Sequence, residues 1–359
     1  MRPGTVRTHS SLASKAAGLV AVLVLLVVCA AMALGNPLAD EESSVGAAAP
    51  TTSLPEPITD ANDTSQSRSA EERRAKRVLT NGCAYTERGI PRCGVLAGAA
   101  YGGNADPLAW ERSMGHRLGV RRTYWTGEKV PDAVAVAKDD LARQRLPWLS
   151  FKLPHSWEEM AAGRGDTWAR ELARQLSLLG GPVWVAFHHE PEGDGDIRAW
   201  TAMQERLAPI IRETAPNVAY SVILTGWHQV QGQQDFSLNS IWPDTRIDIA
   251  GFDVYNKTGM MRNGARIDGF TDFEREYFAE FRRFAKEKDM AWGLAETGQT
   301  HHSALVEPNW ALRTYLSVLR YGGIAFTYFN SKLNSTDPWH LTGAKAEEFA
   351  RVLRTTPTL

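Results

Sequence analysis

Two glutamates follow apolar runs that have strand character. The run Val183–Phe187 is made of the β-branched and aromatic residues that favour a buried parallel strand, and it leads through two histidines to Glu190. The run Ala291–Ala295 leads in the same way to Glu296. Cleavage of a glycosidic bond needs one carboxyl group to protonate the leaving oxygen, and a second to attack the anomeric carbon or activate water. The matched contexts therefore favour glycoside hydrolysis over the alternative that each glutamate begins a solvated loop.

The elements that would position these carboxylates alternate between strands and helices. Eight apolar runs predict strands at Cys93–Ala99, Gly119–Tyr124, Trp148–Leu153, Val183–Phe187, Ala219–Leu224, Ile247–Val254, Ala291–Ala295 and Ile324–Tyr328. Helical signals between them predict Leu108–Leu118, Asp166–Leu179, Ile197–Thr214, a helix after the capping-box pattern Thr271-x-x-Glu274, Pro308–Arg320 and Gly343–Arg354. The connection from Gly226 to Arg246 is irregular.

Eight such units predict a (β/α)₈ barrel, because each strand is apolar enough to be buried on both faces. An open doubly wound sheet is the alternative. That fold would carry a glycine-rich phosphate loop after the first strand, and Gly102-Gly103-Asn104 does not have the G-x-G-x-x-G spacing.

In a barrel of this kind the chemistry gathers at the carboxyl ends of the strands. We expect burial near Phe187 and Pro191 to raise the pKa of Glu190, and a hydrogen-bond donor or a cation to keep Glu296 ionised. The polar and aromatic residues expected to contact substrate at these ends are Arg122, Trp125, His155, Trp157, His189, Trp227, Tyr255 and Trp339.

Composition sets the bounds of the domain. The chain has 359 residues, of which 43% are hydrophobic, and a formal net charge of −1, so no basic excess points to nucleic acid. No aromatic residue precedes Tyr85, which predicts that a compact catalytic domain spans 82–359 and that 34–81 is a disordered linker. The flat faces of its 12 Trp residues suit pyranose rings, although core packing would account for most of them.

The first 33 residues have the pattern of an export signal. Arg2, Arg7 and Lys15 precede an apolar run, and Ala31-Met32-Ala33 fits a small-x-small cleavage site. The alternative is an uncleaved anchor that tethers the chain to the membrane through residues 16–34. Both hypotheses place the domain outside the cell, either secreted or on the outer face of the membrane. Because that compartment is oxidising, we expect Cys83 and Cys93 to form a disulfide.

The chain resembles the retaining β-glycanases whose catalytic glutamates follow barrel strands four and seven. Within that clan it is most similar to glycoside hydrolase family 26, on the segments FHHEPEGD around Glu190, GFDVYN around Tyr255 and GLAETG around Glu296. The resemblance covers about residues 94 to 345. It implies that Glu190 is the general acid/base and Glu296 the nucleophile, with carboxyl groups about 5–5.5 Å apart.

The same resemblance implies that His189 flanks the acid and that Tyr255 donates a hydrogen bond to the nucleophile. It also assigns sugar contacts to His155 and Trp157, and it implies an endo-acting enzyme for a mannan-like β-1,4-glycan. The sequence departs from the family in Tyr328-Phe329-Asn330, where the clan commonly has a tryptophan. It also departs in Pro191-Glu192-Gly193-Asp194, which replaces the usual continuation after the acid.

Other functions find less support. The pairs His188-His189 and His301-His302 lack the H-E-x-x-H spacing of a zinc helix, and we predict no cofactor or catalytic metal. Glu192, Asp194 and Asp196 could bind a structural calcium, but a solvated acidic loop is the simpler interpretation. A serine hydrolase would need a G-x-S-x-G elbow, which is missing from the sequence.

A barrel that binds glycan without cleaving it remains the alternative function. Retention of two neighbouring carboxylates argues against it, since a binder gains little from burying them. We expect the domain to be monomeric. The residues leave open mannan, xylan, mixed-linkage glucan and bacterial surface polysaccharide as the substrate.

Overall fold

The computed structural model describes residues 68, 71–72, 75–268, 272–332 and 339–359. The predicted export signal lies outside this range, as do nearly all of the predicted linker and Thr271 of the expected capping box. Within the described part of the chain, no helix has the length and apolar character needed to cross a membrane.

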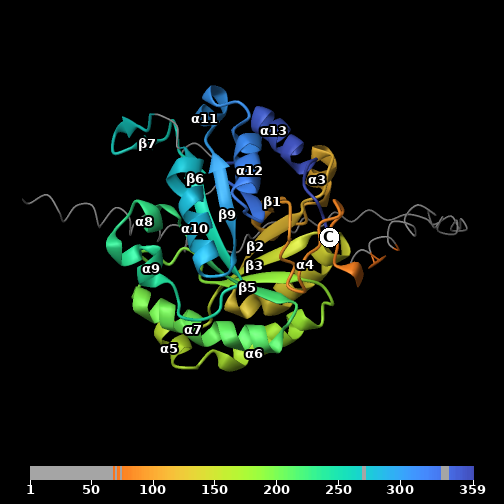
Figure 1. Cartoon of the computed structure of the whole chain (residues 1–359), viewed down its shortest axis with the longest axis vertical. Coiled ribbons are helices and arrows are strands. Elements are labelled where there is room, and N and C mark those ends of the chain that lie inside the picture. The colour runs from red at the N-terminus through yellow and green to blue at the C-terminus, as the bar shows by residue number, and fades with distance from the viewer. Residues whose placement is uncertain (1–67, 69–70, 73–74, 269–271, 333–338) are drawn as a thin grey trace, which may run out of the picture. The chain divides into compact units, whose positions relative to one another are not determined.

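Eight parallel strands close into a barrel in the order β1-β10-β9-β6-β5-β4-β3-β2, with helices around the outside (Figure 1). The predicted (β/α)₈ fold is confirmed. The barrel strands are β1 (Leu96–Tyr101), β2 (Val120–Thr126), β3 (Leu146–Lys152), β4 (Val183–Phe187), β5 (Val218–Leu224), β6 (Ile249–Asn256), β9 (Ala291–Gln299) and β10 (Ala325–Asn330).

Helices follow the strands and pack against them. They are α3 (Leu108–Met114), α4 (Val130–Ala142), α5 (Trp157–Ala161), α6 (Asp166–Ser177), α7 (Ile197–Thr214), α8 (Trp227–Val230), α9 (Leu238–Ile241), α10 (Ala279–Glu287), α11 (His301–Val306), α12 (Trp310–Arg320) and α13 (Gly343–Leu353). Short 3₁₀ or π turns occupy Gly102–Asn104, Gly127–Lys129, Gln234–Phe236 and Glu274–Phe278. The irregular connection predicted after β5 contains α8 and α9, each of four residues.

The connection that follows β6 carries a pair of short strands of its own. A small antiparallel hairpin, β7 (Met261–Arg262) with β8 (Ala265–Arg266), is inserted between β6 and the π turn before α10. Gly264 has a φ of +77°, a left-handed backbone conformation that glycine adopts without strain, so the two strands can turn back on each other there.

The core is filled by large side chains from both sides of the barrel wall. Trp148 and Trp184 are fully buried and meet edge to face with ring centroids 5.0 Å apart. Phe252 of β6 stacks on Phe281 of α10 at 3.5 Å. Phe281 and Phe284 of α10 are both fully buried, so one face of this helix packs into the core.

The N-terminal edge of the barrel begins earlier than residue 82, the predicted start. Leu79 is only 1% exposed, and Thr80 and Thr358 exchange hydrogen bonds of 2.9 and 3.0 Å. The boundary therefore lies near Arg77, because a buried leucine and a paired backbone belong to the folded unit. The predicted disulfide between Cys83 and Cys93 is present in this segment, with Cα atoms 5.5 Å apart.

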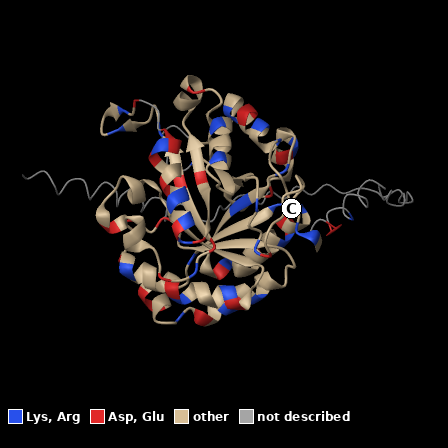
Figure 2. Cartoon of the chain, viewed as in Figure 1, with Lys and Arg blue, Asp and Glu red and all other residues tan. Residues whose placement is uncertain are grey.

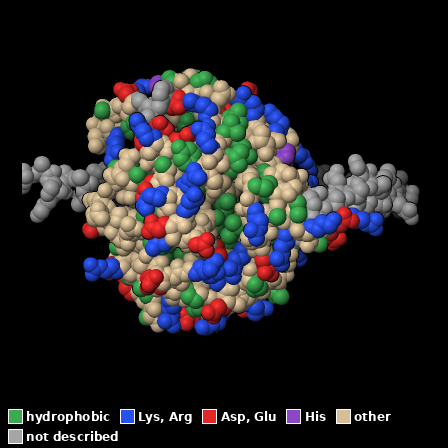
Figure 3. All heavy atoms as spheres, viewed as in Figure 1, with side chains coloured by type: hydrophobic (Ala, Val, Ile, Leu, Met, Phe, Trp, Pro, Cys, Tyr) green, Lys and Arg blue, Asp and Glu red, His purple; other side chains and the backbone are tan. Residues whose placement is uncertain are grey.

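The outer surface mixes Lys and Arg with Asp and Glu over most helices (Figure 2). One apolar stripe stands out over α11 and α12 (Figure 3), where Leu305, Val306, Leu316 and Leu319 are exposed.

Candidate active site

Glu296 lies within β9 rather than at its end, where the sequence placed it. The pairing of β9 with β6 passes from Phe252–Leu294 to Asp253–Glu296, so Ala295 is an extra residue in β9. The pairing with β10 shifts at the same level. A β-bulge of this kind re-aims the side chains next to it. The strand then continues for three residues and holds Glu296 from both sides.

Two tyrosines and an arginine converge on the Glu296 carboxylate. The Tyr124 hydroxyl donates to Oε1 at 2.6 Å, and the Tyr255 hydroxyl donates to Oε2 at 2.5 Å. The Arg122 guanidinium lies 3.5 Å from Oε1 and is itself fixed by a 2.7 Å hydrogen bond to the Ser150 hydroxyl. Glu296 is 6% exposed, so these donors replace the water that an ionised carboxylate needs.

Glu190 stands three residues beyond β4, on a strained stretch of backbone. His188 and Glu190 have φ values of +45° and +52°, in the left-handed region that residues other than glycine rarely adopt. The Glu190 amide is tied to the Ile223 carbonyl of β5 at 3.0 Å. Such conformations cost roughly 1–3 kcal/mol each and cluster at functional sites, where the surrounding structure enforces them.

Burial and nearby charges set the protonation of Glu190. Burial raises the pKa of Glu190 well above its usual value, and the negative charges of Glu296 and then Glu192 raise it further. Lys257 and Arg122 act in the opposite direction but more weakly. Glu190 is therefore held in its protonated form at a pH where an ordinary glutamate is ionised, as the sequence analysis expected.

His189 directly precedes Glu190 in the sequence and approaches Glu296 in space. Its Nε2 atom is 4.0 Å from Oε1 of Glu296, and its ring is 5.5 Å from that of Tyr124. Burial lowers the pKa of His189 well below the usual value, and the charge of Arg122 lowers it further. The ring is therefore neutral at neutral pH and can donate one hydrogen bond towards the site.

Asp253 and Tyr124 were not among the predicted site residues. Asp253 of β6 is 2% exposed, and neither of its oxygens has a hydrogen-bond partner in the described part of the chain. Burial raises its pKa well above the usual value, followed by the charges of Glu296 and Glu190. Tyr124 is the last residue of the predicted strand Gly119–Tyr124, and Asp253 lies one residue before the end of the predicted strand Ile247–Val254. These positions could have suggested both residues but could not have ranked them.

Strand alternation explains why Tyr124, and not its neighbour Trp125, meets the Glu296 carboxylate. Side chains of a strand alternate between its two faces, and Arg122 and Tyr124 both point at Glu296. Trp125 instead shares a face with Thr123, to which its indole nitrogen donates at 2.9 Å. Trp125 is partly exposed but does not reach the carboxylate through any described contact.

The remaining predicted substrate contacts differ in how much ring they expose. Trp227 is 42% exposed at the start of α8. His155, in the β3–α5 connection, is partly exposed. Trp157 is only 7% exposed, with its ring edge on His188 at 4.7 Å, and Gly195 packs so closely that a Cβ there would lie 2.9 Å from the indole. Trp157 therefore supports His188 and offers little face to a sugar.

β10, the eighth strand of the barrel, has Phe329 where the clan that the sequence resembles commonly has a tryptophan. Phe329 meets Tyr124 and Tyr255 edge-on at 6.2 and 6.4 Å. Trp339, which is 3% exposed, lies 4.7 Å from the ring of Tyr255. These rings hold the tyrosine hydroxyls in position and exclude water from the side of Glu296.

Each carboxylate of the acidic loop after Glu190 has a protein partner. Glu192 accepts hydrogen bonds from the Thr225 amide and the Gln229 side chain. Asp194 contacts Nε2 of His188 at 2.9 Å, and Asp196 caps the first turn of α7 through the Arg198 amide. The loop is thus tied to the protein by the groups that the calcium hypothesis would have used as ligands.

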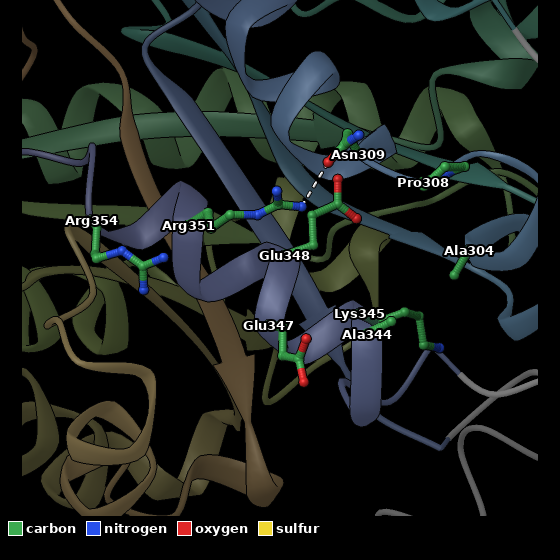
Figure 4. A pocket seen from close by; sticks show the side chains of 9 residues that line it. All are labelled: Ala304, Pro308, Asn309, Ala344, Lys345, Glu347, Glu348, Arg351 and Arg354. Atoms are coloured by element: carbon green, nitrogen blue, oxygen red, sulfur yellow. Dashed lines mark hydrogen bonds between the residues drawn. The ribbon is translucent and has the colours of Figure 1, made fainter.

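A pocket of about 410 Å³ lies elsewhere, between α13 and the residues that join α11 to α12 (Figure 4). Arg351 of α13 spans one side of it and donates to the Asn309 side chain at 2.7 Å. None of the predicted site residues lines this pocket. Its lining residues are Ala304, Pro308, Asn309, Ala344, Lys345, Glu347, Glu348, Arg351 and Arg354.

Comparison with known proteins gives no sequence match and many structural ones. No family model matches the chain, and no curated protein matches its sequence. A family 26 β-mannanase from Bacteroides ovatus superposes with a TM-score of 0.53 at 15% identity, covering 74% of this chain and 90% of that one.

Two further solved structures come from other glycosidases. An exo-β-1,4-mannosidase from an Opitutaceae bacterium gives a TM-score of 0.54 at 14% identity, over 77% of this chain and 62% of that one. Cel5A of Thermotoga maritima, in complex with mannotriose, gives 0.50 at 13% identity, over 71% and 97%. At these identities the similarity establishes that the chain has the (β/α)₈ barrel fold of these glycosidases.

Proposed function

We propose that the protein is a glycoside hydrolase that cleaves a β-linked polysaccharide with retention of anomeric configuration. The observation that carries the proposal is that two carboxyl groups at the barrel mouth have different surroundings. Glu296 receives three donors, whereas Glu190 has a raised pKa. Glycosidic cleavage requires one carboxylate that attacks the anomeric carbon and one acid that donates a proton, and these surroundings suit Glu296 to the first role and Glu190 to the second.

The first step joins the substrate to the protein. An oxygen of Glu296 attacks the anomeric carbon as the glycosidic C–O bond breaks, and Glu190 gives its proton to the leaving oxygen. Tyr124, Tyr255 and Arg122 hold Glu296 so that one oxygen meets the sugar from a fixed direction. The neutral imidazole of His189 lies beside both groups and can donate to a sugar hydroxyl.

The second step frees the sugar. Glu190, now ionised, takes a proton from water as the water oxygen attacks the anomeric carbon, and the bond to Glu296 breaks. Two displacements at one carbon restore the original configuration. Glu190 has then regained its proton and Glu296 its charge, which returns the site to its starting state.

We favour a mannan-like β-1,4-glycan backbone and endo action. The sequence resemblance to family 26 supports this choice, and the structural neighbours that are a β-mannanase and an exo-β-1,4-mannosidase support the mannan-like backbone. A non-catalytic glycan-binding barrel is the alternative that a turnover assay on a polysaccharide panel distinguishes.

The proposal includes action outside the cell. The export pattern of residues 1–33 and the disulfide between Cys83 and Cys93 both support a secreted or membrane-tethered enzyme, because disulfides persist in oxidising compartments.

The deciding experiment follows the product. Proton NMR of the first-formed sugar, recorded before mutarotation, should show the configuration of the substrate. An initially inverted product would remove Glu296 from its role as nucleophile. Glu190→Ala with azide and a substrate that has a good leaving group should form a glycosyl azide, because a small anion can replace the base-activated water of the second step.

A further inference from the structure

A basic segment follows the carboxyl end of β6, the strand that carries Tyr255. Lys257 comes directly after the last residue of β6, and the hairpin β7–β8 that follows carries Arg262 and Arg266. Figure 2 shows the Lys and Arg positions of this hairpin where it stands out from the barrel. Asp268 is the acidic residue of the segment from 257 to 268.

The hairpin is fixed to the barrel at its base. The amide of Gly259 donates to the Ile267 carbonyl, and the amide of Ile267 donates to Met260, both at 2.8 Å. Gly259 packs on His302 of α11 so closely that a Cβ would lie 2.4 Å from that side chain. The Arg266 guanidinium lies 3.4 Å from Nδ1 of the same histidine. The position of the arginines relative to the barrel is therefore set by packing as well as by the turn.

Among the described residues, the three cations form no ion pair with a carboxylate. Within residues 75–268, 272–332 and 339–359, no ion pair joins Lys257, Arg262 or Arg266 to Asp or Glu, although most other arginines around the barrel have one. Arg262 is exposed, and the hairpin also exposes Met261 to 57%. The positive charges of Lys257, Arg262 and Arg266 are thus not balanced by an ion pair with any described carboxylate, although Arg266 contacts His302.

Lys257 acts on the catalytic acid without bonding to it. Its charge lowers the pKa of Glu190, against the larger effects of burial and of Glu296. In a hydrolase for neutral sugars this cation would only favour the ionised form of Glu190, which has no proton to give to the leaving oxygen. A substrate carboxylate next to Lys257 would offset its charge and so favour the protonated form of Glu190 when substrate is bound.

We propose that the substrate glycan carries carboxylates, and that Lys257, Arg262 and Arg266 bind them along the side of the cleft formed by β6 and the hairpin β7–β8. The inference rests on the proposed function and names the class of its substrate, an acidic β-linked polysaccharide. Arginine suits this role because its planar fork of donors matches a carboxylate, and lysine adds a point charge near the bond to be cleaved.

The test compares one polymer in two charge states. A β-1,4-linked polysaccharide with glucuronate groups and the same polymer after carbodiimide–borohydride reduction of its carboxyl groups are given to the full chain. Wild type should cleave the acidic form at least about tenfold faster in kcat/KM, the effect expected of one hydrogen-bonded charge pair. Equal rates, or faster cleavage of the reduced polymer or of plain mannan, would overturn the inference and leave the proposed function standing.

Variants test whether the hairpin residues cause the preference for the acidic polymer. The double variant Arg262→Gln/Arg266→Gln should lower the acidic-to-reduced rate ratio at least about tenfold, and Lys257→Gln should lower it too. Lys138→Gln, which removes an exposed cation on α4, is the matched control and should keep the wild-type ratio. An unchanged ratio in the double variant would show that these residues do not read the substrate's charge.

Failure of the glycosidase assignment can be distinguished from failure of the proposed carboxylate site. If wild type hydrolyses none of the polymers, the glycosidase assignment is wrong, and affinity electrophoresis through gels of the two polymers decides the inference alone. Retardation in the acidic gel that disappears in the double variant but not in Lys138→Gln would support the carboxylate site. Equal mobility in both gels would reject it.

Discussion

At the scale of single residues, the site depends on how the Glu296 carboxylate is held. Each of its oxygens accepts a tyrosine hydroxyl, and Arg122 approaches Oε1 from a third direction. Every one of these donors is itself fixed, Arg122 by Ser150 and the tyrosines by Phe329. A carboxylate that cannot rotate reaches the anomeric carbon in one orientation. We expect this to raise kcat more than it raises the affinity for substrate.

Removal of either carboxyl group should therefore end catalysis. Glu190→Gln and Glu296→Gln change side-chain volume little and should each lower kcat on polysaccharide at least about a thousandfold, because they remove the acid and the nucleophile. Circular dichroism melts should show that both variants fold. Near-wild-type turnover in a folded variant would contradict the assignment of that glutamate.

The two tyrosines should contribute separately. Tyr124→Phe and Tyr255→Phe each remove one hydrogen bond to a charged group, so each should lower kcat/KM roughly 10- to 100-fold. Tyr315→Phe is the control, since its hydroxyl bonds only to the Val95 and Thr355 carbonyls away from the site. A Tyr124→Phe enzyme with wild-type kinetics would show that its hydroxyl merely fills space.

Asp253 makes stability depend on pH. Its folded pKa is raised, so above about pH 4 the unfolded chain releases a proton that the folded chain keeps, and stability falls as pH rises from there. Asp253→Asn removes this loss. The Tm of the variant minus that of wild type should therefore become more positive between about pH 4 and pH 7.

Calorimetry at both pH values checks this expectation. Asp289→Asn, on an exposed turn after α10, controls for the general effect of removing one negative charge. A difference that stays constant with pH, or grows more negative, would show that Asp253 is not held protonated in the folded protein.

At the scale of elements, strand irregularities decide where the chemistry lies. β9 gains an extra residue at Ala295, and the chain after β4 twice enters the left-handed region before it reaches Glu190. A regular strand would send alternate side chains to opposite faces and could not present Glu296 beside Tyr255 in this way. The strand predicted at Ala291–Ala295 therefore starts where β9 starts, but β9 continues to Gln299.

The disulfide at the barrel edge should act on stability and not on the site. It closes a loop of ten residues, so its reduction should destabilise the fold by about 3 kcal/mol and lower Tm by roughly 5–10 °C. Activity at 25 °C should persist, since Cys83 and Cys93 lie in the N-terminal segment before β1. Loss of turnover upon reduction at that temperature would connect the segment to the cleft.

At the scale of the whole molecule, barrel closure gathers residues that are far apart in the sequence. Tyr124 and Glu296 are 172 positions apart, and Tyr255 and Glu296 are 41 apart, yet all three meet at one carboxylate. The N-terminal edge of the barrel must also be covered. The segment from Val78 to Tyr85 covers it through β-bridges and through burial of Leu79.

Truncation should locate this edge. Deletion of residues 1–76 should keep the Tm of the domain, because Arg77 and all packed residues after it remain. Deletion of residues 1–80 removes buried Leu79 and the Thr80–Thr358 pairing, and should lower Tm by at least about 5 °C. Equal melting of the two proteins would restore the boundary that the sequence suggested at residue 82.

The sequence by itself determined the fold and the two central glutamates. Strand periodicity, the apolar runs and the helix signals depend on local residue types, and β4 and α7 were predicted with their observed bounds. The aromatic-free N-terminal stretch and the two cysteines likewise indicated the start of the domain to within a few residues and its disulfide.

Only the tertiary structure decided which side chains serve the glutamates. Tyr124, and not Trp125, meets Glu296 because strand alternation sends neighbouring side chains to opposite faces of β2. A shift of one residue in strand register would reverse that arrangement. The bulge that orients Glu296 and the isolation of Asp253 arise from pairing between distant strands, as does the placement of Lys257 near Glu190. Such contacts depend on the register of a closed barrel, and no local pattern in the sequence encodes that register.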